Sequence, residues 1–160
     1  MMVKLIIFDV YGTLIKADYA DGVIRLGLRE LLEFYKDKLK VTCSDGPEEI
    51  VGADLESVGL YRDFDMHYFA DSLIRSSRTL KNLGKICYEA NLPTSEAVFI
   101  GDNFVGRDED SAQQFGVRFI KVPQFRQKLP PYSERLTHEE WVIYEDSQNP
   151  FSFESLIGKL

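Results

Sequence analysis

Short apolar runs alternate with amphipathic segments along the first 122 residues. The runs are rich in Val, Ile, Leu and Phe, which is typical of strands buried on both faces of a parallel sheet. They cover residues 3–8, 39–43, 64–69, 97–100 and 117–122, of which 64–69 has the most mixed pattern. In the segments between them, apolar residues recur every three or four positions, which predicts helices. These segments cover residues 28–38, 47–59, the later part of 73–89, and 108–115.

This alternation predicts an α/β fold, in which helices connect parallel strands and cover both faces of the sheet. We expect a three-layer, doubly wound (Rossmann-like) sheet of five or six strands. The end of the chain is less regular: residues 123–137 look like a loop, 141–144 like a short edge strand, and 151–160 like a last helix. A length of 160 residues predicts a single domain spanning 1–160.

Composition narrows the range of partners. The 19 basic and 26 acidic residues give a net charge of −7, which argues against nucleic acid or an anionic membrane as the default partner. The two cysteines have no CxxC spacing, so we expect buried thiols in a reducing compartment. No stretch approaches the ~18 apolar residues of a membrane span. These features together predict a cytoplasmic protein.

Three of the predicted strands end in polar residues, namely Asp9, Ser44 and Asp102. In open parallel sheets, ligands bind at the carboxyl ends of the strands. If the three strands are neighbours, these side chains converge at one edge. Carboxylates there suit Mg²⁺, which takes oxygen ligands.

The same residues fit phosphoryl chemistry. One oxygen of Asp9 can attack a phosphorus atom and form an acyl phosphate, which splits hydrolysis into two steps. A hydroxyl and a cation must then offset the charge on the phosphoryl group. Ser44 offers the hydroxyl, and either Lys81 or Arg78 offers the cation. We expect Asp45, Asp110 and Arg107 to be surface or helix-capping residues.

Over nearly its whole length the sequence resembles the haloacid dehalogenase superfamily of hydrolases. The resemblance rests on three segments, 8–14, 43–46 and 97–102, and on Asp108, Ala112 and Gly116 in the helix that follows. It implies a sheet ordered 3-2-1-4-5 with Asp9 as the nucleophile. It also implies a Mg²⁺ site made by Asp9, the backbone carbonyl of Tyr11, Asp102 and, as an outer ligand or water holder, Asp108.

Tyr11 departs from the family pattern, because phosphatases of the superfamily usually carry a second aspartate there as general acid and base. A tyrosine at this position resembles the dehalogenase branch. With a reference pKa near ~10, a phenol is a poor base for activating water at neutral pH. We therefore expect slow hydrolysis of an aspartyl-phosphate.

Two other departures concern the surroundings of the site. Only residues 15–25 separate the first motif from the next helix, so we expect no separate cap domain. An open site favours a macromolecular substrate or a homo-oligomer in which a neighbouring subunit covers the site. The usual lysine of the family precedes a proline, whereas an ungapped count reaches Ser77, beside Arg78. Lys81 is the nearest lysine, and its flexible ammonium favours it modestly.

The leading hypothesis is a Mg²⁺-dependent phosphatase that acts through an aspartyl-phosphate on Asp9, with a phosphorylated small molecule or macromolecule as substrate. Asp102 and Asp108 favour it, because a metal-free enzyme has little use for that much negative charge near its nucleophile. One alternative is a dehalogenase that uses Asp9 on carbon, which Tyr11 favours and the missing cap disfavours. The other is a non-enzymatic binding protein on the same fold.

Overall fold

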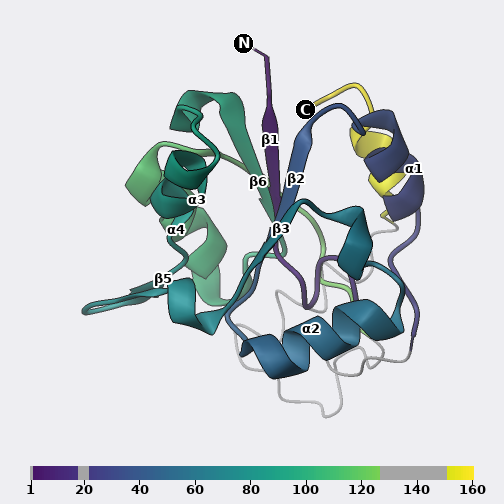
Figure 1. Ribbon diagram of the computed structural model, residues 1–160, viewed down its shortest axis with the longest axis horizontal. Helices are drawn as coiled ribbons and strands as arrows, with labels where there is room; N and C mark the ends of the chain where they lie inside the picture. Colours follow the sequence, from purple (N-terminus) through teal and green to yellow (C-terminus); the bar gives the residue numbers. More distant parts are fainter. Residues whose placement is uncertain (1, 18–21, 127–150) are drawn as a thin grey trace, which may run out of the picture.

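The computed structural model describes residues 2–17, 22–126 and 151–160. Its main sheet has five parallel strands in the order β3-β2-β1-β6-β7 (Figure 1). The strands are β1 (Leu5–Phe8), β2 (Leu39–Cys43), β3 (Met66–Tyr68), β6 (Ala97–Gly101) and β7 (Arg118–Lys121). Because β4 and β5 lie outside this sheet, the order is the predicted 3-2-1-4-5. The predicted fold class is confirmed, and the described residues contain no cap domain.

In the described part of the chain, four α-helices cover the two faces of this sheet (Figure 1). They are α1 (Leu28–Phe34), α2 (Glu48–Ser57), α3 (Leu83–Glu89) and α4 (Arg107–Phe115). Short 3-10 turns occur at Tyr61–Asp63, Ala70–Ser72, Thr94–Glu96, Phe104–Gly106 and Phe153–Leu156. In the described residues, no helix combines the length and apolarity needed to cross a bilayer.

The central strand β1 shows why three layers form. All four of its residues are fully buried, and they alternate between two hydrophobic clusters. Ile6 and Phe8 pack with apolar residues of α1 and α2, whereas Leu5 and Ile7 pack with those of α3 and α4. Because successive side chains of a strand point to opposite faces, a strand that is apolar at every position needs a helical layer on each side of the sheet.

The early part of 73–89, before the predicted helix, has no regular structure predicted from the sequence, but residues 74–80 do form one. They form an antiparallel hairpin of β4 (Ile74–Arg75) and β5 (Thr79–Leu80), which projects away from the main sheet (Figure 1). Two-residue strands are too short for a period of two to appear in the sequence. Arg78 at the turn is anchored to α4 by an ion pair with Asp110.

The predicted helix over 151–160 is wrong, because only Phe153–Leu156 forms a 3-10 turn. The conformation of this segment is set by its contacts with distant residues. The Phe153 ring is fully buried, and its backbone N–H donates to the carbonyl of Leu26 at 2.9 Å. A Cβ on Gly27 would lie 2.3 Å from Ser152 Oγ, so the two backbones cross where only glycine fits.

The remaining predictions for the end of the chain fall partly or wholly outside the described residues. The loop predicted for 123–137 is described only as far as residue 126, and the strand predicted for 141–144 lies outside the described residues. The assignment of 1–160 to one domain stays a prediction.

Candidate active site

Asp9, Ser44 and Asp102 lie at one edge of the sheet because they follow the ends of three adjacent strands. Asp9 comes after β1, Ser44 after β2 and Asp102 after β6. The register pairs the last residue of β1, Phe8, with a residue on each neighbouring strand. All three side chains are buried.

These residues line a cavity of about 290 Å³ at the carboxyl edge. Its walls carry four aspartates and three basic side chains. The lining residues are Asp9, Tyr11, Ala17, Ser44, Asp45, Gly46, Lys81, Asp102, Phe104, Arg107, Asp108, Gln124 and Arg126. The cavity therefore brings charged side chains of both signs together, beside the apolar surface of residues such as Phe104.

The carboxylate of Asp9 is fixed at both oxygens. Oδ1 accepts a hydrogen bond from Lys81 Nζ at 2.8 Å, and Oδ2 accepts one from Thr13 Oγ1 at 3.0 Å. Thr13 Oγ1 also accepts from the backbone N–H of Asp102 at 3.1 Å, so one hydroxyl ties the ends of β1 and β6 together. Burial raises the pKa of Asp9 to about 7, against the lowering effect of Lys81.

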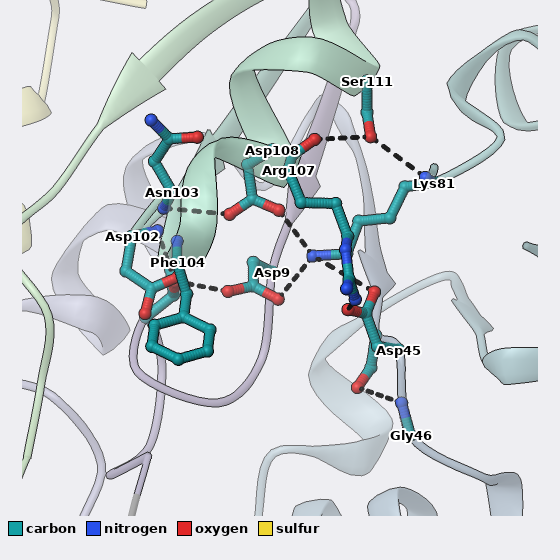
Figure 2. A network of polar contacts seen from close by, with 12 residues as sticks. Asp9, Asp45, Gly46, Lys81, Asp102, Asn103, Phe104, Arg107, Asp108 and Ser111 are labelled. Atoms are coloured by element: carbon teal, nitrogen blue, oxygen red, sulfur yellow. Dashed lines mark hydrogen bonds and ion pairs between the residues drawn. The ribbon is translucent and has the colours of Figure 1, made fainter. Parts of the chain in front are cut away.

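Lys81 lies between β5 and α3, and its Nζ points between two carboxylates (Figure 2). It donates to Asp108 Oδ1 at 2.7 Å as well as to Asp9. Its backbone N–H donates to Ser111 Oγ of α4 at 3.0 Å, which fixes the start of the side chain. Burial lowers the pKa of this ammonium, but Asp9, Asp108 and Asp45 together raise it well above its usual value. Lys81 is therefore charged at neutral pH.

Arg78, the other candidate cation, lies elsewhere. It forms an ion pair with Asp110, its guanidinium donates to the carbonyl of Val105 at 2.9 Å, and its side chain is about half exposed. It does not line the cavity. Of the two candidates left open by the sequence, the structure places Lys81 against Asp9.

Asp108 reaches the site because Gly101 makes room for it. A Cβ at Gly101 would lie 2.3 Å from Asp108 Oδ2. That oxygen accepts from the backbone N–H of Asn103 at 3.1 Å. Asn103 and Val105 both have positive φ values, 59° and 52°, which is costly for a β-branched residue such as Val105. Burial raises the pKa of Asp108 to about 6, while Lys81 lowers it and Asp9 raises it.

Asp102 is held in a similar way. Gln124 Nε2 donates to Asp102 Oδ2 at 3.0 Å. Gly12 has a φ of 78°, and a Cβ there would lie 2.3 Å from the same Oδ2. Burial raises the pKa of Asp102, and the nearby charge of Asp108 adds to this effect. The turn after β1 thus needs glycine both for its backbone conformation and for the close approach of Asp102.

The three buried carboxylates offer a divalent cation a suitable set of ligands. One oxygen from each of Asp9, Asp102 and Asp108 lies within 4.8 Å of the others. Mg²⁺ takes carboxylate oxygens as ligands, so the chemistry of this donor set would suit the ion. When all three carboxylates are ionised, they exceed the single ammonium of Lys81 by two negative charges, which a divalent ion would balance.

Tyr11 lines the cavity, but its hydroxyl is held by α2. The hydroxyl donates to Asp54 Oδ2 at 2.5 Å. Burial raises the pKa of Tyr11 above its usual value, and the bond to Asp54 raises it further. The phenol is therefore a still weaker base than its ordinary value implies.

Asp45 and Arg107 were expected at the surface or in helix caps. Their side chains are 38% and 33% exposed, but the prediction missed their place in the site. Both line the cavity and form an ion pair with each other (Figure 2). Asp45 does not cap α2, whose N-cap is Pro47 with no side-chain hydrogen bond. Asp45 instead lies 3.8 Å from Lys81 Nζ.

The sequence reasoning also missed Thr13 and Gln124. Thr13 follows Asp9 by four residues in the turn that Gly12 permits, so its spacing could have indicated it. Gln124 lies beyond β7 in a segment without periodicity, and no local signal identifies it as a partner of Asp102.

The chain has the fold of haloacid dehalogenase superfamily hydrolases. No protein-family model matches the chain, and no curated protein sequence matches it. The likeness lies in solved structures, whose identities of 12–15% in the three cases described next show the fold alone.

A haloacid dehalogenase-like family hydrolase from Streptococcus pneumoniae superposes with a TM-score of 0.62 at 12% identity, over 78% of this chain and 88% of that one. An L-2-haloacid dehalogenase from Xanthobacter autotrophicus gives 0.59 at 15% identity, over 79% and 80%. A predicted phosphoglycolate phosphatase from Haemophilus somnus gives 0.58 at 14% identity, over 80% and 89%.

Proposed function

We propose that the protein is a Mg²⁺-dependent phosphoryl hydrolase that forms an aspartyl-phosphate on Asp9. The observation that carries the proposal is the buried charge cluster. Lys81 bridges Asp9 and Asp108 at 2.8 and 2.7 Å, and Asp102 lies close to both. A cluster that has two uncompensated negative charges when its carboxylates are ionised suits a divalent cation and, through it, a phosphoryl dianion. The phosphatase among the structural neighbours is consistent with this assignment.

The residues of the cavity fit separate roles in this chemistry. Asp9 attacks phosphorus, and Lys81 keeps the attacking carboxylate oriented and offsets its charge. Ser44 Oγ accepts from the backbone N–H of Gly46 at 3.2 Å, so its hydroxyl proton is available to a phosphoryl oxygen. Asp9, Asp102, Asp108 and the carbonyl of Tyr11 would hold Mg²⁺, which would neutralise the phosphoryl oxygens.

Tyr11 does not supply a base in this scheme. Its hydroxyl is donated to Asp54, and its raised pKa keeps it protonated. Hydrolysis of the aspartyl-phosphate is then slow unless another group in the cavity accepts a proton from water.

Two features bear on the substrate and on the alternatives. Without a cap domain in the described residues, the cavity suits the phosphate of a small molecule or of a macromolecule, and a second copy of the chain could cover it. Dehalogenation requires an apolar site for the departing halide, whereas this cavity is lined by four aspartates. The charge of the lining therefore favours phosphoryl transfer over the dehalogenase alternative.

The decisive experiment measures phosphate release from an aryl phosphate with Mg²⁺ and with a chelator. We expect release that requires Mg²⁺ and is abolished in Asp9→Asn. Asp37→Asn, a matched change at an exposed aspartate, should keep full activity. Metal-independent halide release from a 2-haloacid would instead establish the dehalogenase. If neither product forms, the binding-protein alternative stands.

A further inference from the structure

We propose that Asp45 is the general acid and base of the reaction, in place of the residue at position 11. This inference rests on the proposed function, because it assigns a proton carrier to the two steps of an aspartyl-phosphate mechanism. The carriers available in the cavity are few. Asp9 is the nucleophile, Asp102 and Asp108 lie in the acidic cluster, and Tyr11 is committed to Asp54.

The position of Asp45 suits the role. One oxygen, Oδ2, is held by the guanidinium of Arg107. The other, Oδ1, is buried and has no hydrogen-bond partner among the described residues. Oδ1 lies 3.8 Å from Lys81 Nζ, which itself lies 2.8 Å from Asp9 Oδ1. The two carboxylates therefore flank one ammonium and cannot be farther apart than the sum of those distances.

Oδ1 of Asp45 has the ion pair with Lys81 but no hydrogen bond, and a buried acceptor without a hydrogen-bond donor is destabilising. A water molecule placed for attack on the phosphoryl group of Asp9 is such a donor. The backbone around Asp45 is also fixed. The N–H of Gly46 donates to Ser44 Oγ, and a Cβ at Gly46 would lie 2.6 Å from Val51 Cγ2.

The proton balance closes over the two steps. In the first, Asp9 forms a bond to phosphorus, the bond from phosphorus to the leaving oxygen breaks, and protonated Asp45 gives its proton to that oxygen. In the second, a water oxygen bonds to phosphorus while Asp45 takes a proton from the water. The bond between phosphorus and Asp9 breaks, Asp9 regains its carboxylate, and hydrogen phosphate leaves. Asp45 is then protonated for the next turnover.

The experiment separates formation of the aspartyl-phosphate from its hydrolysis. Wild type and Asp45→Asn are mixed with an aryl phosphate and Mg²⁺. The burst of phenol reports formation, and intact mass after rapid quenching reports the phosphorylated enzyme. We expect Asp45→Asn to form the intermediate and to hydrolyse it about 10²- to 10⁴-fold more slowly. Asp110→Asn, which alters an aspartate paired with Arg78 outside the cavity, should match wild type.

A double variant and a pH profile distinguish catalysis by Asp45 from a merely structural role. Asparagine can still accept from Arg107 through its carbonyl, so a positioning role would survive Asp45→Asn. The double variant Tyr11→Asp/Asp45→Asn should hydrolyse the intermediate at least tenfold faster than Asp45→Asn, because it places a carboxylate in the cavity at position 11, after β1. Recovery below that, despite normal formation of the intermediate, would overturn the proposal.

The pH profile gives an independent readout. The charged groups that form ion pairs with Asp45 are Arg107 from α4 and Lys81 from the segment before α3. Lys81 stays charged, because Asp9, Asp108 and Asp45 raise its pKa. The thiol of Cys43 stays neutral, because burial raises its pKa to about 12. We expect the acidic limb of the hydrolysis rate in wild type to be lost in Asp45→Asn. Equal hydrolysis rates or identical pH profiles in the two proteins would refute the role of Asp45. Failure of wild type to form any phosphorylated Asp9 would instead refute the proposed function.

Discussion

Replacing Lys81 by methionine tests the buried charge network most directly. Methionine has a similar length and no charge, and the side chain of Lys81 is only 3% exposed. Removing one partner of a buried ion pair costs about 3–5 kcal/mol, because it leaves an uncompensated buried charge. Here two carboxylates, Asp9 and Asp108, lose the same ammonium. They can avoid part of that cost by binding protons, so the effect depends on pH.

The sign of this dependence follows from the pKa values. Burial raises the pKa of Asp9 from 3.8 to about 7 and that of Asp108 from 3.8 to about 6. The folded protein thus binds these protons more tightly than the unfolded chain. The resulting stabilisation is complete below about pH 4 and is lost as the pH rises towards 7. Without Lys81 both pKa values rise further, and the loss extends to higher pH.

We therefore expect Lys81→Met to be less stable than wild type by about 1 kcal/mol or less near pH 5 and by about 3–5 kcal/mol near pH 8. Urea unfolding in the presence of a chelator measures both values. Lys40→Met is the matched control, because Lys40 is also buried but donates to the carbonyls of Tyr35 and Lys38 at 3.1 and 2.8 Å. Its cost should be equal at the two pH values. Parallel stability curves for wild type and Lys81→Met would refute the reasoning.

Three other predictions address the metal, a glycine and the second cation. Mg²⁺ should raise the midpoint of thermal unfolding of wild type by mass action, and Asp102→Asn should lose most of this shift when both proteins are heated in a scanning calorimeter. Gly101→Ala should cost at least about 1–3 kcal/mol in urea unfolding because its Cβ would overlap Asp108, whereas Gly52→Ala, whose Cβ has no neighbour closer than 3.8 Å, should be neutral or stabilising. Arg78→Ala should keep phosphatase turnover within about twofold of wild type, since Arg78 pairs outside the cavity at a half-exposed position; a loss comparable to that of Lys81→Met would contradict the placement of Lys81.

The fold was predictable because its signals are local. An all-apolar strand such as β1 can be recognised from its own residues, and three strands that end in polar side chains indicate the edge where a ligand binds. The hairpin at 74–80 and the 3-10 turn at Phe153 were not predicted. One is too short to show a period, and the other is set by a contact with Leu26 that is distant in sequence.

The site was predictable only as far as strand ends and motifs reach. Asp9, Ser44 and Asp102 follow from where strands stop. Asp45 was misplaced because a residue after a strand and before a helix is, in most proteins, a capping or surface residue. Its role depends on Arg107, more than sixty residues later, and that pairing becomes visible only when the start of α4 is placed beside the end of β2.

Positions 11 and 45 are best understood together. A carboxylate at position 11 would lie on the β1 side of the cavity, but Tyr11 directs its hydroxyl to Asp54 of α2. A carboxylate is present instead at position 45, after β2. One of its oxygens is held by Arg107, and the other is buried near Lys81 without a hydrogen-bond partner in the described residues. The cavity therefore retains a carboxylate outside the cluster of Asp9, Asp102 and Asp108, and this carboxylate follows a different strand. A carboxylate at position 45 can stand in for one at position 11, because β1 and β2 are neighbours and end at the same edge of the sheet. Both positions therefore lie near the nucleophile Asp9.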